Sequence, residues 1–174
     1  MSAWFAAVAA LPEMQRDYLN LLLLTGLRKN ECSEVRRKDV DLVAGLLLIP
    51  ETKGKNPHSL PITEPMRQIL ERRCQTLEPS ARLFAGLSAD HVTEMAERAG
   101  APKFTLHDLR KLVASVGARL NVGDAILRRI LGHAPKFGDT LHKHYVRLGP
   151  SDVLEPLKEI QLSLQRHQTR QRES

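Results

Sequence analysis

Apolar residues recur at every third or fourth position over most of this chain, which is the spacing of one face of an α-helix. Local signals mark some of the ends. Pro12 suits a first helical turn, and Thr25-Gly26 stops the helix that follows it. Helices are therefore predicted over residues 11–24, 29–36, 64–77, 89–99, 106–120 and 126–131.

Residues 45–62 follow a different pattern. An apolar run, 45–50, is followed by a polar stretch rich in turn-forming residues, 51–58, and then by a second apolar run, 59–62. This order predicts a β-hairpin with a long flexible tip. Pro61 cannot donate a hydrogen bond to a neighbouring strand, so its strand should lie at the edge of the sheet. The predicted fold class is mainly α (α+β), helical with a small β-hairpin.

A last apolar stripe predicts a C-terminal helix with one face turned to the rest of the protein. Its members are Val153, Leu154, Leu157, Ile160 and Leu164. The residues that follow, 166–174, are polar, and we expect them to form a flexible tail. The chain has 174 residues, of which 42% are apolar, and this is enough for one domain with a proper core.

The overall charge indicates the kind of partner. Lys and Arg number 26 against 20 acidic residues, so the net charge is +6, which fits a phosphate-rich partner. Aromatic residues make up only 4% of the chain, which is unlike a platform that stacks single-stranded bases.

No segment suits a membrane or a secretory signal. The apolar run Leu19–Leu24 is far shorter than the roughly 20 residues that a membrane helix needs. The apolar start of the chain, residues 1–11, has no basic flank before it. Cys32 and Cys74 are isolated, which indicates a reducing compartment and no zinc site. We expect a cytoplasmic protein.

Four places hold residue types that folding alone does not require. In chain order they are Arg28 with Glu31, Lys53 in the hairpin tip, the pair His107 and Arg110, and His133 with Tyr145. Each has a structural explanation when taken singly: a surface ion pair, a solvated loop lysine, a helix-terminal histidine, a half-buried tyrosine. The three-residue spacing of His107 and Arg110 places both on one helix face, beside the apolar face rather than within it.

The ordered combination resembles the catalytic domain of the tyrosine recombinases, the phage integrase family. That family carries an Arg in a Thr-Gly-Leu-Arg-x-x-Glu context, a Lys in a hairpin, His-x-x-Arg, Leu-Gly-His and a Tyr, in this order. The matching segments are Thr25–Glu31, Lys53, His107–Arg110, Leu131–His133 and Tyr145. The resemblance runs from about Leu11 to about Leu148.

The resemblance implies a domain organisation. It makes residues 1–150 a catalytic domain, and 151–165 a C-terminal helix that either packs on its own domain or is exchanged between subunits. Relatives carry a further N-terminal DNA-clasping domain that this chain lacks, so we expect a fragment or an unusually short member. The interval from His133 to Tyr145 is a few residues longer than is usual. Tyr18, the other tyrosine, is expected in the core.

The implied reaction is site-specific DNA cleavage and rejoining through a 3′-phosphotyrosyl intermediate. The expected catalytic residues are Arg28, Lys53, His107, Arg110, His133 and Tyr145. The arginines would hold the phosphate, the histidines would donate hydrogen bonds or move protons, and Tyr145 would attack. Lys53 would protonate the leaving oxygen, with Lys55 as a second candidate. No metal or other cofactor is needed. Glu31 either orients Arg28 or is an ordinary surface acid.

Double-stranded DNA is the expected partner, and phosphate contacts should supply most of the affinity. The expected DNA-binding residues are Lys29, Arg36, Arg37, Lys55, Lys111, Lys136 and Lys143. We also expect self-association on DNA, as a dimer or tetramer, with a monomer possible in isolation.

Three other interpretations stay open at this point. Residues 107–131 resemble a helix-turn-helix, so the chain could be a non-enzymatic DNA-binding module. That hypothesis leaves Arg28, Lys53 and Tyr145 unexplained. A type IB topoisomerase shares the constellation of residues but usually not the Leu-Gly-His context. An isolated domain that folds but is only weakly active is the third interpretation.

Overall fold

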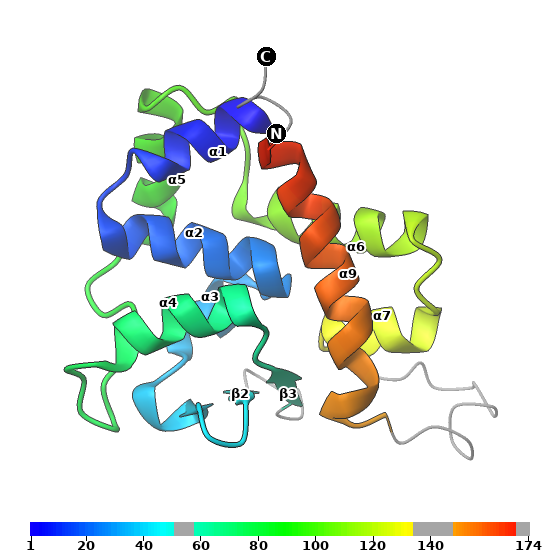
Figure 1. Cartoon of the computed structure of the whole chain (residues 1–174). Coiled ribbons are helices and arrows are strands. Elements are labelled where there is room, and N and C mark those ends of the chain that lie inside the picture. The colour runs from blue at the N-terminus through cyan, green and yellow to red at the C-terminus, as the bar shows by residue number, and fades with distance from the viewer. Residues whose placement is uncertain (51–57, 134–147, 170–174) are drawn as a thin grey trace.

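The chain folds around one central helix (Figure 1). The structure, a computed structural model, describes residues 1–50, 58–133 and 148–169. Helix α2 (Glu13–Thr25) is almost fully apolar along its second half, and the four leucines of Leu21–Leu24 are all buried. It is therefore covered on several sides. The covering helices are α1 (Ser2–Ala9), α3 (Lys29–Glu34), α4 (Glu64–Cys74) and α6 (Leu106–Arg119).

The predicted helices are confirmed, with small shifts at their ends. Helix α2 begins two residues later than predicted, at Glu13, because Pro12 has an extended backbone (φ −55°, ψ 152°). Helix α4 ends at Cys74, before the predicted Leu77. The others are α3, α6, α5 (Ala89–Arg98) and α7 (Asp124–Ile130).

Helix α1 was not predicted. Its eight residues are apolar on nearly every side, so the sequence has no alternation between a polar and an apolar face. The structure explains this composition, because Trp4, Phe5, Ala7 and Val8 are all buried. Trp4 makes edge-to-face ring contacts with Phe5 and with Phe104.

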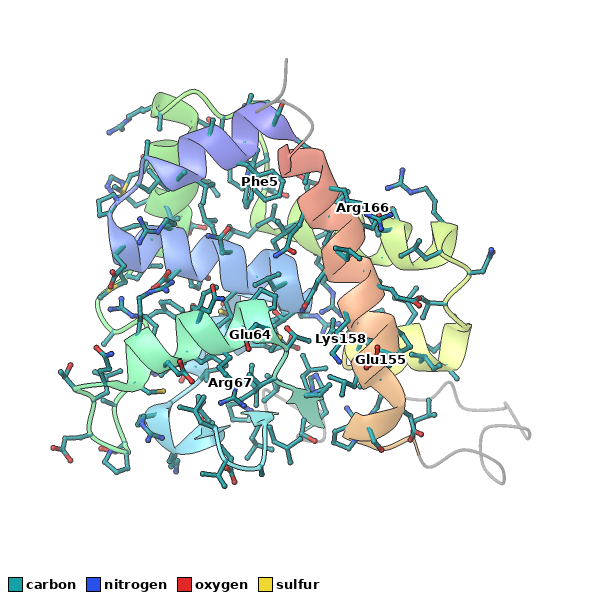
Figure 2. The ribbon with its side chains drawn as sticks, in the orientation of Figure 1. Phe5, Glu64, Arg67, Glu155, Lys158 and Arg166 are labelled. Atoms are coloured by element: carbon teal, nitrogen blue, oxygen red, sulfur yellow. The ribbon has the colours of Figure 1, made fainter. Side chains whose placement is uncertain are left out.

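The hairpin is confirmed and is part of a three-stranded antiparallel sheet with the order β1-β2-β3. The strands are β1 (Val40–Asp41), β2 (Leu46–Ile49) and β3 (His58–Pro61), with a 3₁₀ turn η1 (Arg37–Asp39) before them. Pro61 does lie in an edge strand, as predicted. The register pairs Ile49 with His58, next to the hairpin tip. Figure 2 shows Arg67 of α4 beside this sheet, where its Nη1 donates to the Leu42 carbonyl at 3.1 Å.

The C-terminal helix α9 (Pro150–Thr169) lies across α6, α7 and β3 of its own chain (Figure 1). Val153, Leu157, Ile160 and Leu164 of the predicted stripe are buried. On the outer face, Lys158 pairs with Glu155 at 2.7 Å (Figure 2). The predicted tail from residue 166 is wrong at its start, because the helix continues to Thr169. Exchange of this helix between subunits stays a prediction.

Two further expectations can be compared with the described residues. Tyr18 is a core residue as predicted, with no exposed surface, and its hydroxyl lies 3.3 Å from both the Lys29 carbonyl and Ser33 Oγ. Within the described ranges, no helix combines the length and the apolar character needed to cross a membrane.

Candidate active site

The first arginine, Arg28, stands at a corner between two helices. Helix α2 ends at Thr25, and the residue that caps it, Gly26, has a left-handed backbone (φ +66°). A Cβ at this glycine would lie 2.8 Å from Leu131 Cδ2, so both the conformation and the space favour glycine. Leu27 is then buried, and Arg28 becomes the N-cap of α3. Its side chain is 34% exposed and lines a cleft.

Glu31 holds Arg28 in place. One carboxylate oxygen accepts the Arg28 backbone N–H at 2.8 Å, and the other accepts the Arg28 guanidinium at 2.7 Å. The side chain is only 4% exposed, so Glu31 is not an ordinary surface acid. Burial by itself raises the pKa of this carboxyl group, but the hydrogen bonds from Arg28 and the charges of Arg28 and Arg110 outweigh it. The pKa of Glu31 is therefore lowered.

Arg110 lies deeper than predicted. The sequence placed it beside the apolar face of its helix, but its side chain is 6% exposed, whereas His107 is exposed. The burial is tolerated because the guanidinium has partners. Nη1 donates to the Gly26 carbonyl and Nη2 to the Leu131 carbonyl, both at 2.6 Å. Glu31 lies 3.9 Å away and is its nearest counter-charge among the described residues.

Burial also affects the charge on Arg110. Desolvation, followed by the nearby charge of Arg28, lowers the pKa of Arg110 to about 10, while Glu31 opposes the shift. The guanidinium still carries its positive charge at neutral pH. It is therefore a buried cation that its surroundings only partly neutralise.

His133 is held beside Arg110 by the turn that ends α7. The Gly132 amide donates to the Arg129 carbonyl at 3.3 Å, and the His133 amide to the Arg128 carbonyl at 2.9 Å. Gly132 has a left-handed backbone (φ +59°). This turn places His133 Nε2 2.9 Å from Arg110 Nη2.

His107 lies in the first turn of α6. A capping box starts this helix, because the Thr105 amide donates to Asp108 at 2.9 Å and the Asp108 amide donates to Thr105 Oγ1 at 3.3 Å. Asp108 is thus a helix-capping residue. One cleft of about 1050 Å³ is lined by His107 together with Arg28, Glu31 and Arg110.

The structure brings together Arg28, Glu31, His107, Arg110 and His133 of the predicted site. Five expected site residues lie outside the described residues, in segments 51–57 and 134–147: Lys53, Lys55, Lys136, Lys143 and Tyr145.

The expected DNA-binding residues that are described divide into two groups. Lys29 lines the cleft and pairs with Asp90 at 3.1 Å. The other three are engaged elsewhere and are not among the described residues that line the cleft. Lys111 pairs with Asp108, Arg36 donates to the Ser80 carbonyl, and Arg37 donates to the Val40 carbonyl.

His58 was not among the site residues predicted from the sequence. Its ring packs against Gly132, next to the site. The available signal was the alternation of strand β3, which places His58 on the same face as the buried Leu60.

This arrangement suits a phosphate diester. Arg28 and Arg110 share the one carboxylate of Glu31, so this cluster keeps a positive charge, and each guanidinium has further N–H donors for phosphate oxygens. The two imidazoles can donate hydrogen bonds or accept protons near neutral pH.

Comparison with known proteins gives a consistent result. Residues 4–150 match the model of the phage integrase family. The chain is 28% identical over 170 residues to prophage integrase IntF of Escherichia coli (strain K12), covering 88% of this chain and 35% of the relative. It is 30% identical over 137 residues to tyrosine recombinase XerA of Thermococcus kodakarensis, covering 71% of this chain and 49% of the relative. The chain thus spans less than half the length of these curated relatives.

Solved structures share the fold. The integrase of mycobacterium phage Brujita superposes with a TM-score of 0.67 at 16% identity, over 88% of this chain and 54% of that one. The XerH site-specific recombinase, bound to its difH substrate, superposes with a TM-score of 0.61 at 19% identity, over 76% of this chain and 45% of that one. The resemblance predicted from the ordered motifs is confirmed, and this chain belongs to the phage integrase family.

Proposed function

We propose that this chain is the catalytic domain, over residues 1–150, of a site-specific DNA recombinase that cleaves and rejoins duplex DNA through a 3′-phosphotyrosyl intermediate. The observation that carries the proposal is that Arg28 and Arg110 meet around the single carboxylate of Glu31 in one cleft with the exposed His107, and that His133 lies next to Arg110. Residues from three separate motifs meet there, which folding alone does not require.

In the proposed reaction the two arginines bind the non-bridging oxygens of the scissile phosphate. Their charge stabilises the pentavalent transition state, in which negative charge accumulates on these oxygens. Arg110 is preorganised for this by two backbone carbonyls, and Arg28 by Glu31. His133, next to Arg110, donates a further hydrogen bond to the phosphate.

The covalent step transfers the phosphate between two oxygens. The Tyr145 hydroxyl attacks phosphorus, and its proton passes to His107. The bond from phosphorus to the 5′-oxygen breaks, and Lys53 protonates that oxygen as it leaves. Rejoining is the reverse, with a free 5′-hydroxyl attacking the phosphotyrosine. Bond energy is retained in the intermediate, so the step consumes no nucleotide and requires no metal.

Phosphate contacts hold the duplex. We assign them to Lys29, Arg36, Arg37, Lys55, Lys111, Lys136 and Lys143. We further propose that the protein acts in the cytoplasm, where its DNA is, and assembles on DNA as a dimer or tetramer, with residues 151–165 exchanged between neighbouring subunits. A lambda integrase dimer bound to a COC′ core site shares this fold and supports the assembly.

A helix-turn-helix module and a type IB topoisomerase are not favoured. In a helix-turn-helix module, α6 and α7 would serve duplex recognition, but Arg110 on α6 is buried against the Gly26 carbonyl instead. The family match extends over residues 4–150, well beyond these two helices, and favours site-specific recombination over strand passage.

The experiment that tests the function is trapping of the covalent intermediate. The protein is incubated with a library of nicked duplexes of random sequence, in EDTA, and the products are separated on a denaturing gel. We expect an adduct that Tyr145→Phe abolishes and that Tyr18→Phe, the matched control in the core, leaves intact. A folded wild-type protein that binds the duplexes and forms no adduct would refute the enzyme.

A further inference from the structure

His58 is a half-buried histidine that has no part in the reaction proposed above. It is the first residue of strand β3 and pairs with Ile49 across the hairpin, so the strand register determines its position. Its ring lies directly against Gly132. A Cβ at Gly132 would lie 2.8 Å from His58 Nε2 and 3.0 Å from Nδ1, closer than packed atoms allow.

The polar end of this ring has an unusual environment. Nε2 is buried and has no hydrogen-bond partner among the described residues. Buried ring nitrogens are nearly always paired, and an unpaired one costs free energy. A side chain retained at such a cost, beside a candidate active site, is a candidate for a functional role.

Burial and the nearby charges keep His58 neutral. The positive charges of Arg129, Arg110 and Arg28 act on the ring, and the negative charge of Glu31 acts against them. Burial, and then these arginines, lower the pKa of His58 to about 4, while Glu31 opposes the shift. The ring therefore fills space beneath the turn without adding a further positive charge to the site.

The turn that His58 touches controls two of the proposed phosphate ligands. The Leu131 carbonyl accepts Arg110 Nη2 at 2.6 Å, and His133 Nε2 lies 2.9 Å from the same nitrogen. A shift of Gly132 would move both contacts together.

We propose that His58 is a positioning residue for DNA cleavage, whose ring supports the Leu131–His133 turn and so holds Arg110 and His133 in their reacting geometry. This inference rests on the proposed function. The His58 ring would thereby connect strand β3 to the turn that places Arg110 and His133.

The test is a double-mutant cycle on adduct formation. His58→Ala should lower the single-turnover rate by about 10- to 100-fold, because displacements of about 1 Å have effects of this size. Duplex affinity should stay within about twofold, since outer phosphate contacts supply most of it. His91→Ala, at an exposed histidine of α5, is the matched control and should leave both unchanged.

Gly132→Ala completes the cycle. In wild type it should lower the rate strongly, because the new methyl group runs into His58. In the His58→Ala background the same change should cost several-fold less. Gly86→Ala controls for backbone strain, because Gly86 has φ +79° and open space around its Cβ position. A His58→Ala rate equal to wild type, or an equal cost of Gly132→Ala in both backgrounds, would overturn the proposal.

An NMR measurement distinguishes this failure from failure of the proposed function. The Cε1–H signal of His133 is followed in a pH titration without DNA. We expect its chemical shift and titration midpoint to change in His58→Ala and in His58→Asn, the milder variant, but not in His91→Ala. If wild type forms no adduct, the recombinase proposal fails and this signal alone decides the positioning role. An unchanged His133 signal would overturn it.

Discussion

Two clusters, in each of which two arginines flank a buried carboxylate, lie towards the two ends of α2 and use their charges in opposite ways. Near its start, Asp17 is 1% exposed and pairs with Arg72 at 2.8 Å and with Arg73 at 3.8 Å. Near its end, Glu31 contacts Arg28 at 2.7 Å and Arg110 at 3.9 Å.

The difference lies in which charge is buried. In the first cluster only the acid is buried, and the Arg72 side chain is 40% exposed. In the second, Arg110 is itself buried, at 6% exposed. The hydrogen bond that Arg72 donates to Asp17 raises the pKa of Arg72, whereas burial lowers the pKa of Arg110 to about 10. In the first cluster Glu13 also pairs with Arg73, at 3.3 Å, so two acids balance two arginines and tie α2 to α4. The second cluster has one acid for its two arginines and lacks negative charge that a phosphate could supply.

The largest expected effect comes from replacing the buried cation. Arg110→Lys should lower single-turnover adduct formation by about 100- to 1000-fold, the cost of losing an oriented donor at a developing anion. An ammonium cannot bind the Gly26 and Leu131 carbonyls as a fork and still face a phosphate. Arg72→Lys, in the first cluster, should leave the rate unchanged. Equal rates for the two lysine variants would contradict the comparison.

Removing the buried acid of the first cluster should affect stability instead. Asp17→Asn is expected to lower the free energy of unfolding by about 2–3 kcal/mol, somewhat less than for a fully buried pair because the arginines can reach solvent. Urea denaturation measures this change. Asp124→Asn, which removes an exposed partner of Arg128, is the control and should have little effect. The adduct rate per folded molecule should be that of wild type in both variants.

The acid of the second cluster should show its effect through pH. Glu31→Gln should lower the free energy of unfolding by about 1–2 kcal/mol at pH 7, since it loses charge-assisted hydrogen bonds. The pKa of Glu31 is lower in the folded protein than in the unfolded chain, where it is about 4.3. The charged Glu31 therefore stabilises the fold fully above about pH 4.3, and this stabilisation is lost as the pH falls further. The difference between wild type and Glu31→Gln should therefore shrink in acid. A difference that is constant from pH 7 to pH 3 would refute this account.

The smallest effect on stability is expected at an exposed pair beside the cleft. Lys29→Gln removes the contact with Asp90, and stability should change by less than about 0.5 kcal/mol. Duplex affinity should fall, and its dependence on salt concentration should weaken by about one unit of slope. Lys158→Gln, at the exposed pair on α9, should change neither. If the salt dependence of duplex affinity weakened in Lys158→Gln instead, the duplex would bind on the face of α9 and not at the cleft.

Much of the fold could be predicted because it follows from local patterns. The apolar spacing predicted α5 and α6 to within one residue, and Pro61 predicted an edge strand. Helix α1 was missed because a helix buried on nearly all sides has no polar face. The start of the C-terminal tail was misplaced because a polar helix end resembles a tail in sequence.

The predictions about the site were likewise right where they rested on local motifs and incomplete where they depended on distant residues. The order of its motifs was sufficient to predict that Arg28, His107, Arg110 and His133 would meet. Glu31 had two interpretations, and its burial between two arginines excludes an ordinary surface acid. The position of Arg110 was wrong, because its burial depends on carbonyls 84 and 21 residues away in the chain.

The sequence by itself therefore determined the helices, the hairpin, the positive charge and the identity of the residues that converge. Only the tertiary structure decided which of these charges is buried, that the His58 ring lies against Gly132, and that Arg28 and Arg110 carry more positive charge than Glu31 can neutralise. The physical reason is that periodicity is a local property. The solvation of a charge, in contrast, depends on every group that surrounds it in space.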